Sequence, residues 1–299
     1  MAVDAERGMK VWAVANQKGG VGKTTTAVTL AGLLAQRGHE TLLVDFDPHG
    51  SMTAYFGYDP DNIEDGVYRL FEGGGAGRDR PVPVLRQTRY AHLALLPAST
   101  ALATLDRQLG ARDGMGLVLA RYLRGLSAPF HYVLIDCPSV LGVLMVNALA
   151  ACGHLVIPVQ TEFLALKGLE RMLHTLGMIL HARKIDIPYT IVPALFDRRA
   201  RASVDSLRKL RETYPEHLWQ GAIPVDTQLR EASRLGGPIT HLFPQARGTL
   251  AYTTLLDSLL ADRPTPLDAG ARGIPGTDPF TEDGARGVGE HLNLDVPRA

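Results

Sequence analysis

The sequence is poor in cysteine and carries no net charge. It holds two cysteines in 299 residues, Cys137 and Cys152. Two cysteines are too few for a disulfide framework and show no metal-ligand spacing, which suits a reducing cytoplasm. The 31 basic side chains balance 31 acidic ones. A chain without net charge has no overall field that draws it to nucleic acid or membrane, so any such contact requires a local patch.

Long apolar runs are missing as well. The stretch 140–158 is interrupted by Gly142, Asn147, Gly153 and His154, so it falls short of a membrane-spanning segment. The first ten residues are polar, and we expect no signal peptide. Apolar residues still make up 45% of the chain, which is enough to bury a full core as one large domain or two small ones.

What the chain does contain is a glycine-rich turn between two apolar segments. The turn covers 16–26 and reads Asn-Gln-Lys-Gly-Gly-Val-Gly-Lys-Thr-Thr-Thr. The preceding residues 11–15 are typical of a buried parallel strand. The following apolar residues have the spacing of a helix face, at Ala27, Leu30, Ala31 and Leu34. A strand, a tight turn and a helix N-terminus direct backbone N–H groups at one point, which predicts an anion-binding site.

The side chains of this turn match a phosphate-binding loop. Small residues curl the backbone, because glycine permits the angles that a tight turn needs. These residues are Gly19, Gly20, Val21 and Gly22. Lys23 is expected to reach nucleotide phosphates, the Thr24 hydroxyl to hold Mg²⁺, and Thr25 to continue the nucleotide-binding loop. The plainer alternative, a glycine-rich turn with surface lysines, is disfavoured by the flanking strand and helix.

The turn departs from the general phosphate-loop pattern at two positions. Gln17 stands where a glycine is expected, and Lys18 adds a second lysine before Lys23. With this extra lysine the turn resembles the deviant Walker A motif of the ParA/MinD family of ATPases, and Asn-Gln ahead of it is similar to the ParA (Soj) branch. The resemblance implies ATP and Mg²⁺ as cofactors and a slow hydrolysis of ATP to ADP and phosphate. It also implies an ATP-bound homodimer in which the catalytic Lys18 reaches the partner's nucleotide, and an adaptor or cargo protein that stimulates hydrolysis.

A second candidate segment follows the apolar residues 41–44. Residues 45–50 read Asp-Phe-Asp-Pro-His-Gly, which by itself is typical of a capped strand end and a turn. After a phosphate loop, the segment resembles the switch I of the family. The resemblance implies that Asp47 is needed for hydrolysis and that Asp45 supports Mg²⁺. His49 stands where the family usually has glutamine.

A third candidate segment ends the apolar residues 132–135. It reads Asp-Cys-Pro-Ser over 136–139. An apolar strand that ends in aspartate is the Walker B pattern, so Asp136 is expected to bind Mg²⁺ directly or through water. The segment resembles the Asp-x-Pro-Pro switch II of the family, with Ser139 in place of the second proline.

Weaker resemblances lie in the second half of the chain. Residues 158–162 and 165–169 match a ParA stretch, and 194–199 resemble the family's Thr-Met-Tyr-Asp-x-Arg segment near the adenine. The next strand is expected to end at 223–224, where the family packs a proline on the base. Leu195 and Pro224 are therefore candidates for the adenine pocket, although ordinary packing explains each of them equally well.

Contacts to DNA would come from arginines around a helix predicted over 198–214. The residues expected on its buried face are Val204, Leu207, Leu210 and Tyr214. On its opposite face we expect the ion pairs Arg201–Asp205, Asp205–Lys209 and Arg208–Glu212. A solvated, salt-bridged face is therefore favoured over a phosphate-binding patch. The resemblance to ParA proteins leaves Arg199, Arg230 and Arg234 as weak DNA-contact candidates, and non-specific DNA binding stays open.

The predicted fold is one doubly wound α/β domain with a mostly parallel sheet and helices on both faces. Residues 1–9 form an N-terminal extension, 10–262 the ATPase domain and 263–299 a disordered tail rich in proline and glycine. The tail lacks the basic amphipathic helix with which MinD proteins hold membranes, so we expect no stable membrane anchor. Further strands are expected over 93–97, 154–160 and 187–195, and further helices over 100–109, 116–126, 169–180 and 247–260.

Three classes of function are consistent with these patterns. The leading one is a nucleotide-switched ATPase in the bacterial cytoplasm, at a cell pole or on the nucleoid. Residues 11–58 are similar to the ParC-type branch, which positions chemosensory arrays, and partition of chromosomes or plasmids is the alternative. The second class is a metabolic amide ligase on a related fold, such as a cobyrinic acid amidase. The third is a nitrogenase-reductase-like electron carrier, which is disfavoured because no cysteine precedes Cys137.

Overall fold

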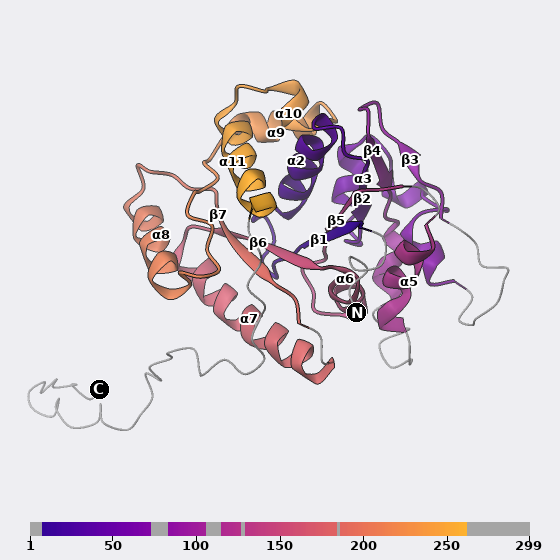
Figure 1. Cartoon of the computed structure of the whole chain (residues 1–299), viewed down its shortest axis with the longest axis horizontal. Coiled ribbons are helices and arrows are strands. Elements are labelled where there is room, and N and C mark those ends of the chain that lie inside the picture. The colour runs from indigo at the N-terminus through magenta and orange to yellow at the C-terminus, as the bar shows by residue number, and fades with distance from the viewer. Residues whose placement is uncertain (1–7, 73–82, 106–114, 127–128, 184–185, 262–299) are drawn as a thin grey trace, which may run out of the picture. The chain divides into compact units, whose positions relative to one another are not determined.

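The computed structural model describes residues 8–72, 83–105, 115–126, 129–183 and 186–261. These residues form a seven-stranded sheet in the order β3-β4-β2-β5-β1-β6-β7 (Figure 1). The strands are β1 (Lys10–Val14), β2 (Thr41–Asp45), β3 (Arg86–Gln87), β4 (Leu93–Leu96), β5 (Tyr132–Asp136), β6 (His154–Gln160) and β7 (Tyr189–Ala194). Neighbouring strands run parallel except for the β3–β4 pair. The predicted mostly parallel sheet is confirmed.

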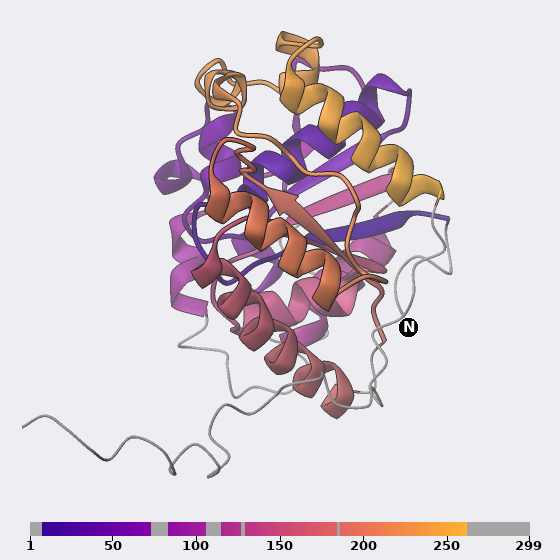
Figure 2. The ribbon, with the colours of Figure 1, turned by 90° about the vertical axis from the view of Figure 1, so that its left-hand side faces the viewer.

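Helices cover both faces of this sheet (Figures 1 and 2). They are α2 (Lys23–Gln36), α3 (Ser51–Tyr55), α5 (Val118–Gly125), α6 (Val143–Ala151), α7 (Phe163–Arg183), α8 (Arg201–Thr213), α9 (Thr227–Arg234), α10 (Ile239–Leu242) and α11 (Arg247–Ala261). Short 3₁₀ segments lie at Pro60–Asn62, Val67–Leu70, Thr100–Thr104 and Met115–Leu117. Helices α2, α9, α10 and α11 pack on one face, and α5, α6 and α7 pack on the other. This is the doubly wound arrangement that the sequence predicts.

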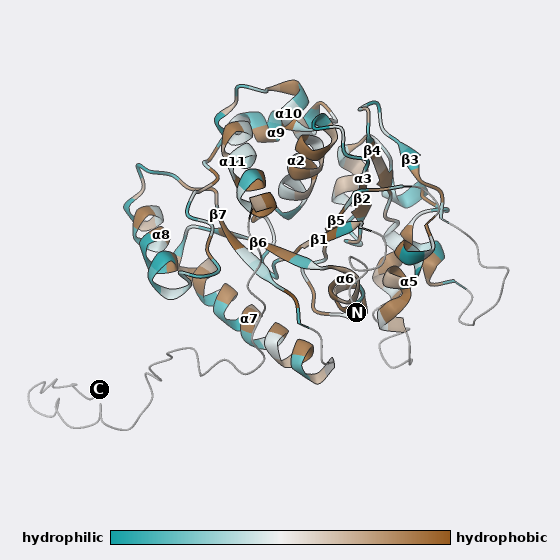
Figure 3. Cartoon of the chain, in the orientation of Figure 1, coloured by the Kyte–Doolittle hydropathy of each residue, from teal (hydrophilic) through white to brown (hydrophobic). Residues whose placement is uncertain are grey.

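Two hydrophobic cores, one on each face, hold the layers together. Alternate residues of β1 enter different cores, Val11 and Ala13 on the side of α6 and Trp12 and Val14 on the side of α2. A strand buried on both faces needs apolar side chains at every position, which explains its uninterrupted apolar sequence. Figure 3 shows apolar residues along β1, β4 and α2, while hydrophilic residues gather on α8.

The helix that follows the phosphate loop is held by the last described helix. The Thr26 hydroxyl in α2 and the Tyr252 hydroxyl in α11 form a hydrogen bond of 2.8 Å. Both side chains are buried, and burial raises the pKa of Tyr252 to about 12. A buried hydroxyl without a partner is costly, so this pair fixes how α2 lies against α11.

Two predictions about the second half of the chain are wrong in detail. The segment before Pro224 forms no regular strand among the described residues and joins β7 through isolated bridges, Ile191 to Leu218 and Phe196 to Pro224. Proline has no N–H to donate, so the segment cannot extend the ladder there. Val204 is also 43% exposed instead of buried. The hydroxyl of Ser203 is buried in its stead, 2.6 Å from the Thr161 hydroxyl.

The outer face of α8 carries ion pairs, as the sequence predicts, but with partly different partners. Arg201 lies 3.7 Å from Asp205, as expected. Arg208 pairs with Asp205 at 2.6 Å and Lys209 with Glu212 at 4.0 Å, where the pairs Asp205–Lys209 and Arg208–Glu212 were expected. The i, i+3 neighbours on a helix are as close as the i, i+4 neighbours, so both spacings compete for the same carboxylates.

Several predictions lie partly or wholly outside the described residues. These are the N-terminal extension up to residue 7, the second part of the helix over 100–109 and the tail at 263–299. Met9, the last residue of the predicted extension, is 5% exposed and packs in the core. Within the described ranges, no helix is long and apolar enough to cross a membrane.

Candidate nucleotide-binding site

The three candidate segments meet at the carboxyl ends of neighbouring strands. Strand β5 lies between β1 and β2, with Val14 opposite Asp136 in one ladder and Asp45 opposite Asp136 in the other. The phosphate loop therefore leaves β1 beside the carboxylates that end β2 and β5. The carboxyl edge of a parallel sheet is where α/β proteins bind ligands.

The backbone of the phosphate loop has the shape of an anion cradle. Gly20 has φ 74° and Gly22 has φ 92°, in the left-handed region that favours glycine. A Cβ added at Gly19, Gly20 or Gly22 would meet no described heavy atom within 4 Å, so the loop borders open space. The N–H groups in the first turn of α2 have no partner within the helix and can bind an anion there. The loop thus fits nucleotide phosphates. Val21 lies within it, and Thr25 lies in the first turn of α2.

Two residues at the start of the loop fasten it to β6 and α7. The buried amide of Asn16 donates to the carbonyl oxygen of Pro158 at 2.8 Å and accepts from the N–H of Lys18 at 2.9 Å. The N–H of Gln17 points to the sulfur of Met172 at 3.4 Å. These contacts hold the loop in a fixed shape, which lowers the entropic cost of binding phosphate.

Lys23 lies inside the site. It is 8% exposed, and its ammonium group donates to the Ser139 hydroxyl at 2.7 Å and to the Lys18 carbonyl oxygen at 3.4 Å. Both contacts place the charge at the mouth of the loop. The contact of Lys23 with a nucleotide phosphate stays a prediction.

Lys18 lies at the rim of the same loop. Its ammonium group forms an ion pair with Glu162 and donates to Gln160 Oε1 at 3.1 Å. The side chains of Lys18 and Glu162 are 36% and 39% exposed. In the single chain, Lys18 therefore bonds to its own β6–α7 connection, and its contact with a partner's nucleotide stays a prediction.

Thr24 and Asp136 form the part of the site that suits a cation. The Thr24 hydroxyl donates to Asp136 Oδ2 at 2.5 Å. The other oxygen, Asp136 Oδ1, is buried and has no hydrogen-bond partner among the described residues. Burial and the nearby Asp45 raise the pKa of Asp136 well above its usual value. A divalent cation would satisfy the free oxygen and offset the buried charge, so these two residues fit the predicted Mg²⁺.

Asp45 has a different set of contacts from the one predicted. Its Oδ2 accepts two bonds of 2.7 Å from Thr53, one from the N–H and one from the hydroxyl. Asp45 is fully buried, and burial raises its pKa to about 7. Asp45 therefore fastens α3 to the end of β2, and its role in supporting Mg²⁺ stays a prediction. The described residues hold no group of three or more His, Cys, Asp or Glu suited to a metal.

Asp47 lies in the turn that follows β2, beyond Asp45. It is 9% exposed, and its Oδ1 accepts from the N–H of His49 at 3.0 Å and lies 2.7 Å from His49 Nδ1. No hydrogen bond joins its other oxygen, Oδ2, to the residues that the structure describes. His49 thus fixes the orientation of the Asp47 carboxylate, and the role of Asp47 in hydrolysis stays a prediction.

The two adenine-pocket candidates lie close together at the end of β7. Leu195 has φ 53°, which turns the chain out of the strand. Directly after it, the N–H of Phe196 donates to the Ile223 carbonyl oxygen at 2.9 Å, and Phe196 bridges to Pro224. The structure thus pairs Pro224 with the residue that follows Leu195, and the contact of the two candidates with a base stays a prediction.

The three DNA-contact candidates differ in how much free charge they have. Arg199 pairs with Asp197 at 3.0 Å, and Arg234 pairs with Glu231 at 2.5 Å. Arg230 is exposed and forms no salt bridge within the described part of the chain. The structure therefore leaves one unpaired arginine of the three, and DNA contact stays a prediction.

Several contacts of the site cannot be recognised from the sequence, even where a residue stands out for another reason. Gln160 and Glu162 lie in the stretch that matches ParA proteins, yet nothing in their spacing indicates a bond to Lys18. Ser139 stands out in the sequence by replacing a proline. Thr53 and Tyr252 have no local pattern that distinguishes them from ordinary helix residues.

A parallel sheet with a phosphate loop after β1 and carboxylates after β2 and β5 defines a P-loop nucleotide-binding protein of the doubly wound class. The family model described as an AAA domain matches residues 9–188. Two named relatives match over more than four fifths of the chain. The chain belongs to the ParA/MinD family of ATPases.

Among proteins of known name, the chain is similar to the chromosome partitioning protein ParA of Myxococcus xanthus strain DK1622. The two are 34% identical over 269 residues, which cover 87% of this chain and 93% of that protein. It is also similar to the sporulation initiation inhibitor protein Soj of Bacillus subtilis strain 168. The identity there is 32% over 254 residues, which cover 85% of this chain and 99% of Soj.

Solved structures share the fold. The cobyrinic acid a,c-diamide synthase from Mycobacterium smegmatis, with bound ATP analog and magnesium, has a TM-score of 0.71 and 33% identity over 84% of this chain and 94% of that chain. An ATP complex of McdA from Cyanothece has a TM-score of 0.74 and 20% identity, with coverage of 87% and 99%. At that identity the second likeness shows the fold only.

Proposed function

We propose that this protein is an ATPase switch that dimerises with ATP and Mg²⁺ and positions or partitions a cellular cargo. The observation that carries the proposal is the placement of two lysines in one phosphate loop. Lys23 is 8% exposed, inside the site, whereas the Lys18 side chain is 36% exposed, at its rim. An inner lysine serves the nucleotide of its own chain, and an outer lysine can reach phosphates held by a second copy.

The residues around the two lysines support a surface that a second copy covers. Val140, Phe163 and Leu164 are 65%, 69% and 73% exposed. Val140 follows Ser139, which contacts Lys23, and the other two follow Glu162, which contacts Lys18. Large apolar side chains that are exposed beside a charged site are typical of an interface that forms in one state of the protein.

Hydrolysis follows from the contacts inside the site. Mg²⁺ bound to ATP offsets the negative charge of the β- and γ-phosphates. Thr24 and Asp136 would hold the cation, Lys23 would neutralise the phosphate oxygens, and Asp47 would position the attacking water. The half-exposed Lys18 adds a positive charge from the second copy.

For the cargo, we favour polar chemosensory arrays, which a protein partner at the pole would connect to the ATPase. The support is the resemblance of residues 11–58 to the ParC-type branch, with histidine at position 49. Chromosome or plasmid partition is the alternative cargo function. The relatives named ParA and Soj support it equally well.

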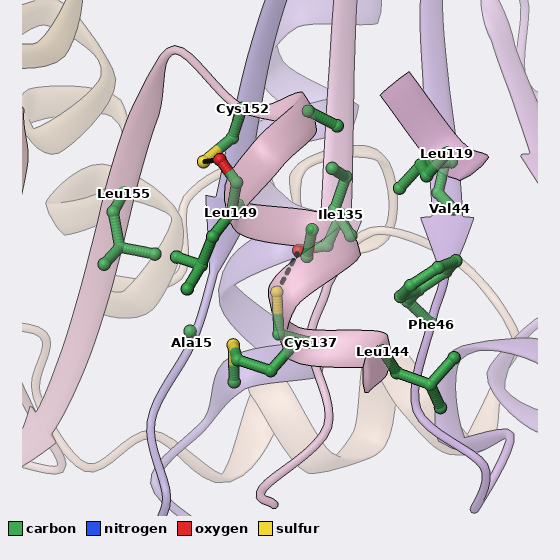
Figure 4. Packing of buried hydrophobic residues seen from close by; sticks show 14 of the residues in the cluster. Ala15, Val44, Phe46, Leu119, Ile135, Cys137, Leu144, Leu149, Cys152 and Leu155 are labelled. Carbon is green, nitrogen blue, oxygen red and sulfur yellow. Dashed lines mark hydrogen bonds between the residues drawn. The ribbon is translucent and has the colours of Figure 1, made fainter. Parts of the chain in front are cut away.

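An amide ligase is a second candidate of another class, because a relative carries the name cobyrinic acid a,c-diamide synthase. A ligase that takes ammonia from glutamine needs a reactive cysteine. Cys137 and Cys152 are 0% and 1% exposed, and their thiols point to the carbonyl oxygens of Ile135 and Leu149 (Figure 4). Burial raises the pKa of Cys137 well above its usual value. Both cysteines are therefore core residues that cannot act as such a nucleophile.

The proposal is tested with the variant Asp47→Ala, compared with the wild type and with Asp61→Ala in an exposed turn. Sedimentation velocity with ATP and Mg²⁺ is expected to show a persistent dimer for Asp47→Ala, and monomers for all three proteins with ADP. Phosphate release is expected from the wild type and Asp61→Ala but not from Asp47→Ala. An Asp47→Ala protein that binds ATP and stays monomeric contradicts the switch. Hydrolysis that requires an added carboxylic acid and ammonia would favour the ligase.

A further inference from the structure

Ser139 connects the phosphate loop with the segment that leaves β5. Its hydroxyl accepts a hydrogen bond of 2.7 Å from the Lys23 ammonium group. The only other contact of that ammonium group within the described residues is the Lys18 carbonyl oxygen, at the longer distance of 3.4 Å. The proline that usually stands in this position has no group that could make the contact.

The position of the hydroxyl is one that a phosphate oxygen would take. A lysine in a phosphate loop bonds to phosphate oxygens at 2.7–2.9 Å, and Ser139 Oγ lies 2.7 Å from Lys23 Nζ. A phosphate oxygen that takes this position displaces the hydroxyl from Lys23. After displacement, the hydroxyl stays near the new oxygen and can donate its proton to it.

Ser139 lies beyond the backbone hydrogen bonds that hold the end of β5. The N–H of Cys137 donates to the Val14 carbonyl oxygen at 3.1 Å, and the Asp136 carbonyl oxygen accepts from Phe46 at 3.0 Å. These bonds fix residues 136 and 137 in the sheet. Ser139 comes after the last of them and before α6, which begins at Val143. The neighbouring Val140 is 65% exposed, so a movement of Ser139 changes the apolar surface beside the site.

The phosphate that Ser139 meets is the terminal one. The glycine-rich loop itself surrounds the α- and β-phosphates with its backbone N–H groups. Ser139 belongs to the segment that follows β5, and it contacts Lys23, the residue of the loop that reaches the β- and γ-phosphates. A group that approaches from outside the loop is left with the γ-phosphate.

We propose that Ser139 distinguishes ATP from ADP by donating a hydrogen bond to the γ-phosphate, in exchange for the bond that it accepts from Lys23 without nucleotide. This proposal rests on the proposed function, because it concerns the nucleotide of the same site. It makes Ser139 a specificity-determining residue that transmits the presence of the γ-phosphate to Val140 and the surface around it.

The test compares the binding of ADP and of a non-hydrolysable ATP analogue, both with Mg²⁺, by titration calorimetry. In Ser139→Ala, the loss of the Lys23 contact affects both nucleotides equally, whereas the γ-phosphate contact is lost only with the analogue. We therefore expect the preference for the analogue over ADP to fall about 10- to 100-fold, as for the loss of one hydrogen bond to a charged group. Ser139→Thr keeps the hydroxyl and is expected to keep most of the preference.

Ser233→Ala is the matched control, because its hydroxyl donates to the Arg230 carbonyl oxygen on exposed α9. The preference of Ser233→Ala for the analogue over ADP is expected to equal that of the wild type. A preference in Ser139→Ala within twofold of the wild-type value overturns the proposal, and thermal unfolding of each variant shows that the fold is intact. If the wild type binds neither nucleotide, the proposed function fails as well. If the wild type binds both and Ser139→Ala keeps its preference, only the role of Ser139 fails.

Discussion

Lys18 and Glu162 form an ion pair across the rim of the phosphate loop, although they lie 144 positions apart in the chain. Both side chains are more than one third exposed. Exposed ion pairs contribute about 0–1 kcal/mol, so the pair favours the intramolecular position of Lys18 only slightly. A lysine that has to contact a second copy can therefore leave Glu162 at little cost once phosphate is available.

Removing the charge of Glu162 is expected to strengthen the ATP-bound dimer. In Asp47→Ala/Glu162→Gln, Lys18 no longer has an acidic partner in its own chain, so the dimer dissociation constant is expected to fall up to about fivefold relative to Asp47→Ala. Sedimentation equilibrium with ATP and Mg²⁺ measures it. The control is Glu170→Gln in the same background, because Glu170 pairs with Lys167 at 3.1 Å on the exposed face of α7. A dimer weakened by Glu162→Gln would show that Glu162 acts across the interface instead.

Replacing Lys23 is expected to impair nucleotide binding, whereas replacing Lys18 is expected to impair the dimer. Lys23→Ala removes a charge-assisted bond to phosphate inside the site, so nucleotide affinity is expected to fall at least about a hundredfold. Lys18→Ala is expected to keep ATP binding and lose the dimer. Titration calorimetry measures the first effect and sedimentation the second, with exposed Lys209→Ala as the control for both. Equal losses of nucleotide affinity in Lys18→Ala and Lys23→Ala would contradict this division.

Stability without nucleotide is expected to rise as the pH falls below 7. The folded pKa of Asp45 is about 7 against 3.8 for the free side chain, so the folded state takes up a proton in a range where the unfolded chain stays ionised. This stabilisation is complete near pH 4 and is lost as the pH rises through 7. Lowering the pH from 7.5 to 5.5 is expected to add about 1–2 kcal/mol from this group.

The measurement is the free energy of unfolding in urea at both pH values, for the wild type and for Asp45→Asn. Asparagine still accepts the Thr53 bonds but cannot titrate, so the gain at low pH is expected to shrink. His154 acts in the opposite sense, because burial lowers its pKa to about 4, and it contributes equally to both proteins. Parallel pH profiles of the two proteins would show that Asp45 is not the group involved.

Binding to non-specific DNA is expected to be weak at physiological salt. Arg199 and Arg234 are already paired with carboxylates, which leaves Arg230 as the candidate with free charge. Binding through a few phosphate contacts falls with roughly the 0.7 to 0.9 power of salt concentration per contact. Fluorescence anisotropy of a labelled duplex with Asp47→Ala and ATP, over a salt series, measures the slope.

Arg230→Ala is expected to reduce the salt slope by about one contact, and Arg208→Ala on the salt-bridged face of α8 serves as the control. Tight, ATP-dependent binding at physiological salt that weakens when Arg230 and Arg234 are removed would favour DNA partition over array positioning as the cargo function.

The part of the site that depends on short segments is predictable from the sequence. Strands β1, β2 and β5 are each an apolar run that ends in a turn or a carboxylate, because strands buried on both faces admit little else. Their order in the sheet then brings the phosphate loop, Asp45 and Asp136 to one edge. The fold and the identity of the binding loop follow from these local patterns.

Contacts between distant segments are not predictable in this way. Lys23 and Ser139 lie 116 positions apart, and no local pattern specifies which hydroxyl a buried lysine contacts. The contacts of Asp45 cannot be predicted from the sequence either, because no local pattern indicates that Thr53 donates two hydrogen bonds to its carboxylate. The predicted buried face of α8 is wrong at Val204 for a related reason. Spacing alone assigns Val204 to the core, whereas the Ser203 hydroxyl lies there because Thr161 and the N–H of Asp197 bond to it.

The bond between Thr26 and Tyr252 has a consequence for the order in which the protein is made. A ribosome delivers the phosphate loop more than two hundred residues before the tyrosine that supports its helix. A nascent chain that ends before α11 therefore presents a loop whose helix has one uncovered face. Such ribosome-bound chains are expected not to retain a labelled ATP analogue. Chains in which residue 261 has emerged from the ribosome are expected to retain it. Nucleotide can thus stabilise this domain only after its synthesis is nearly complete.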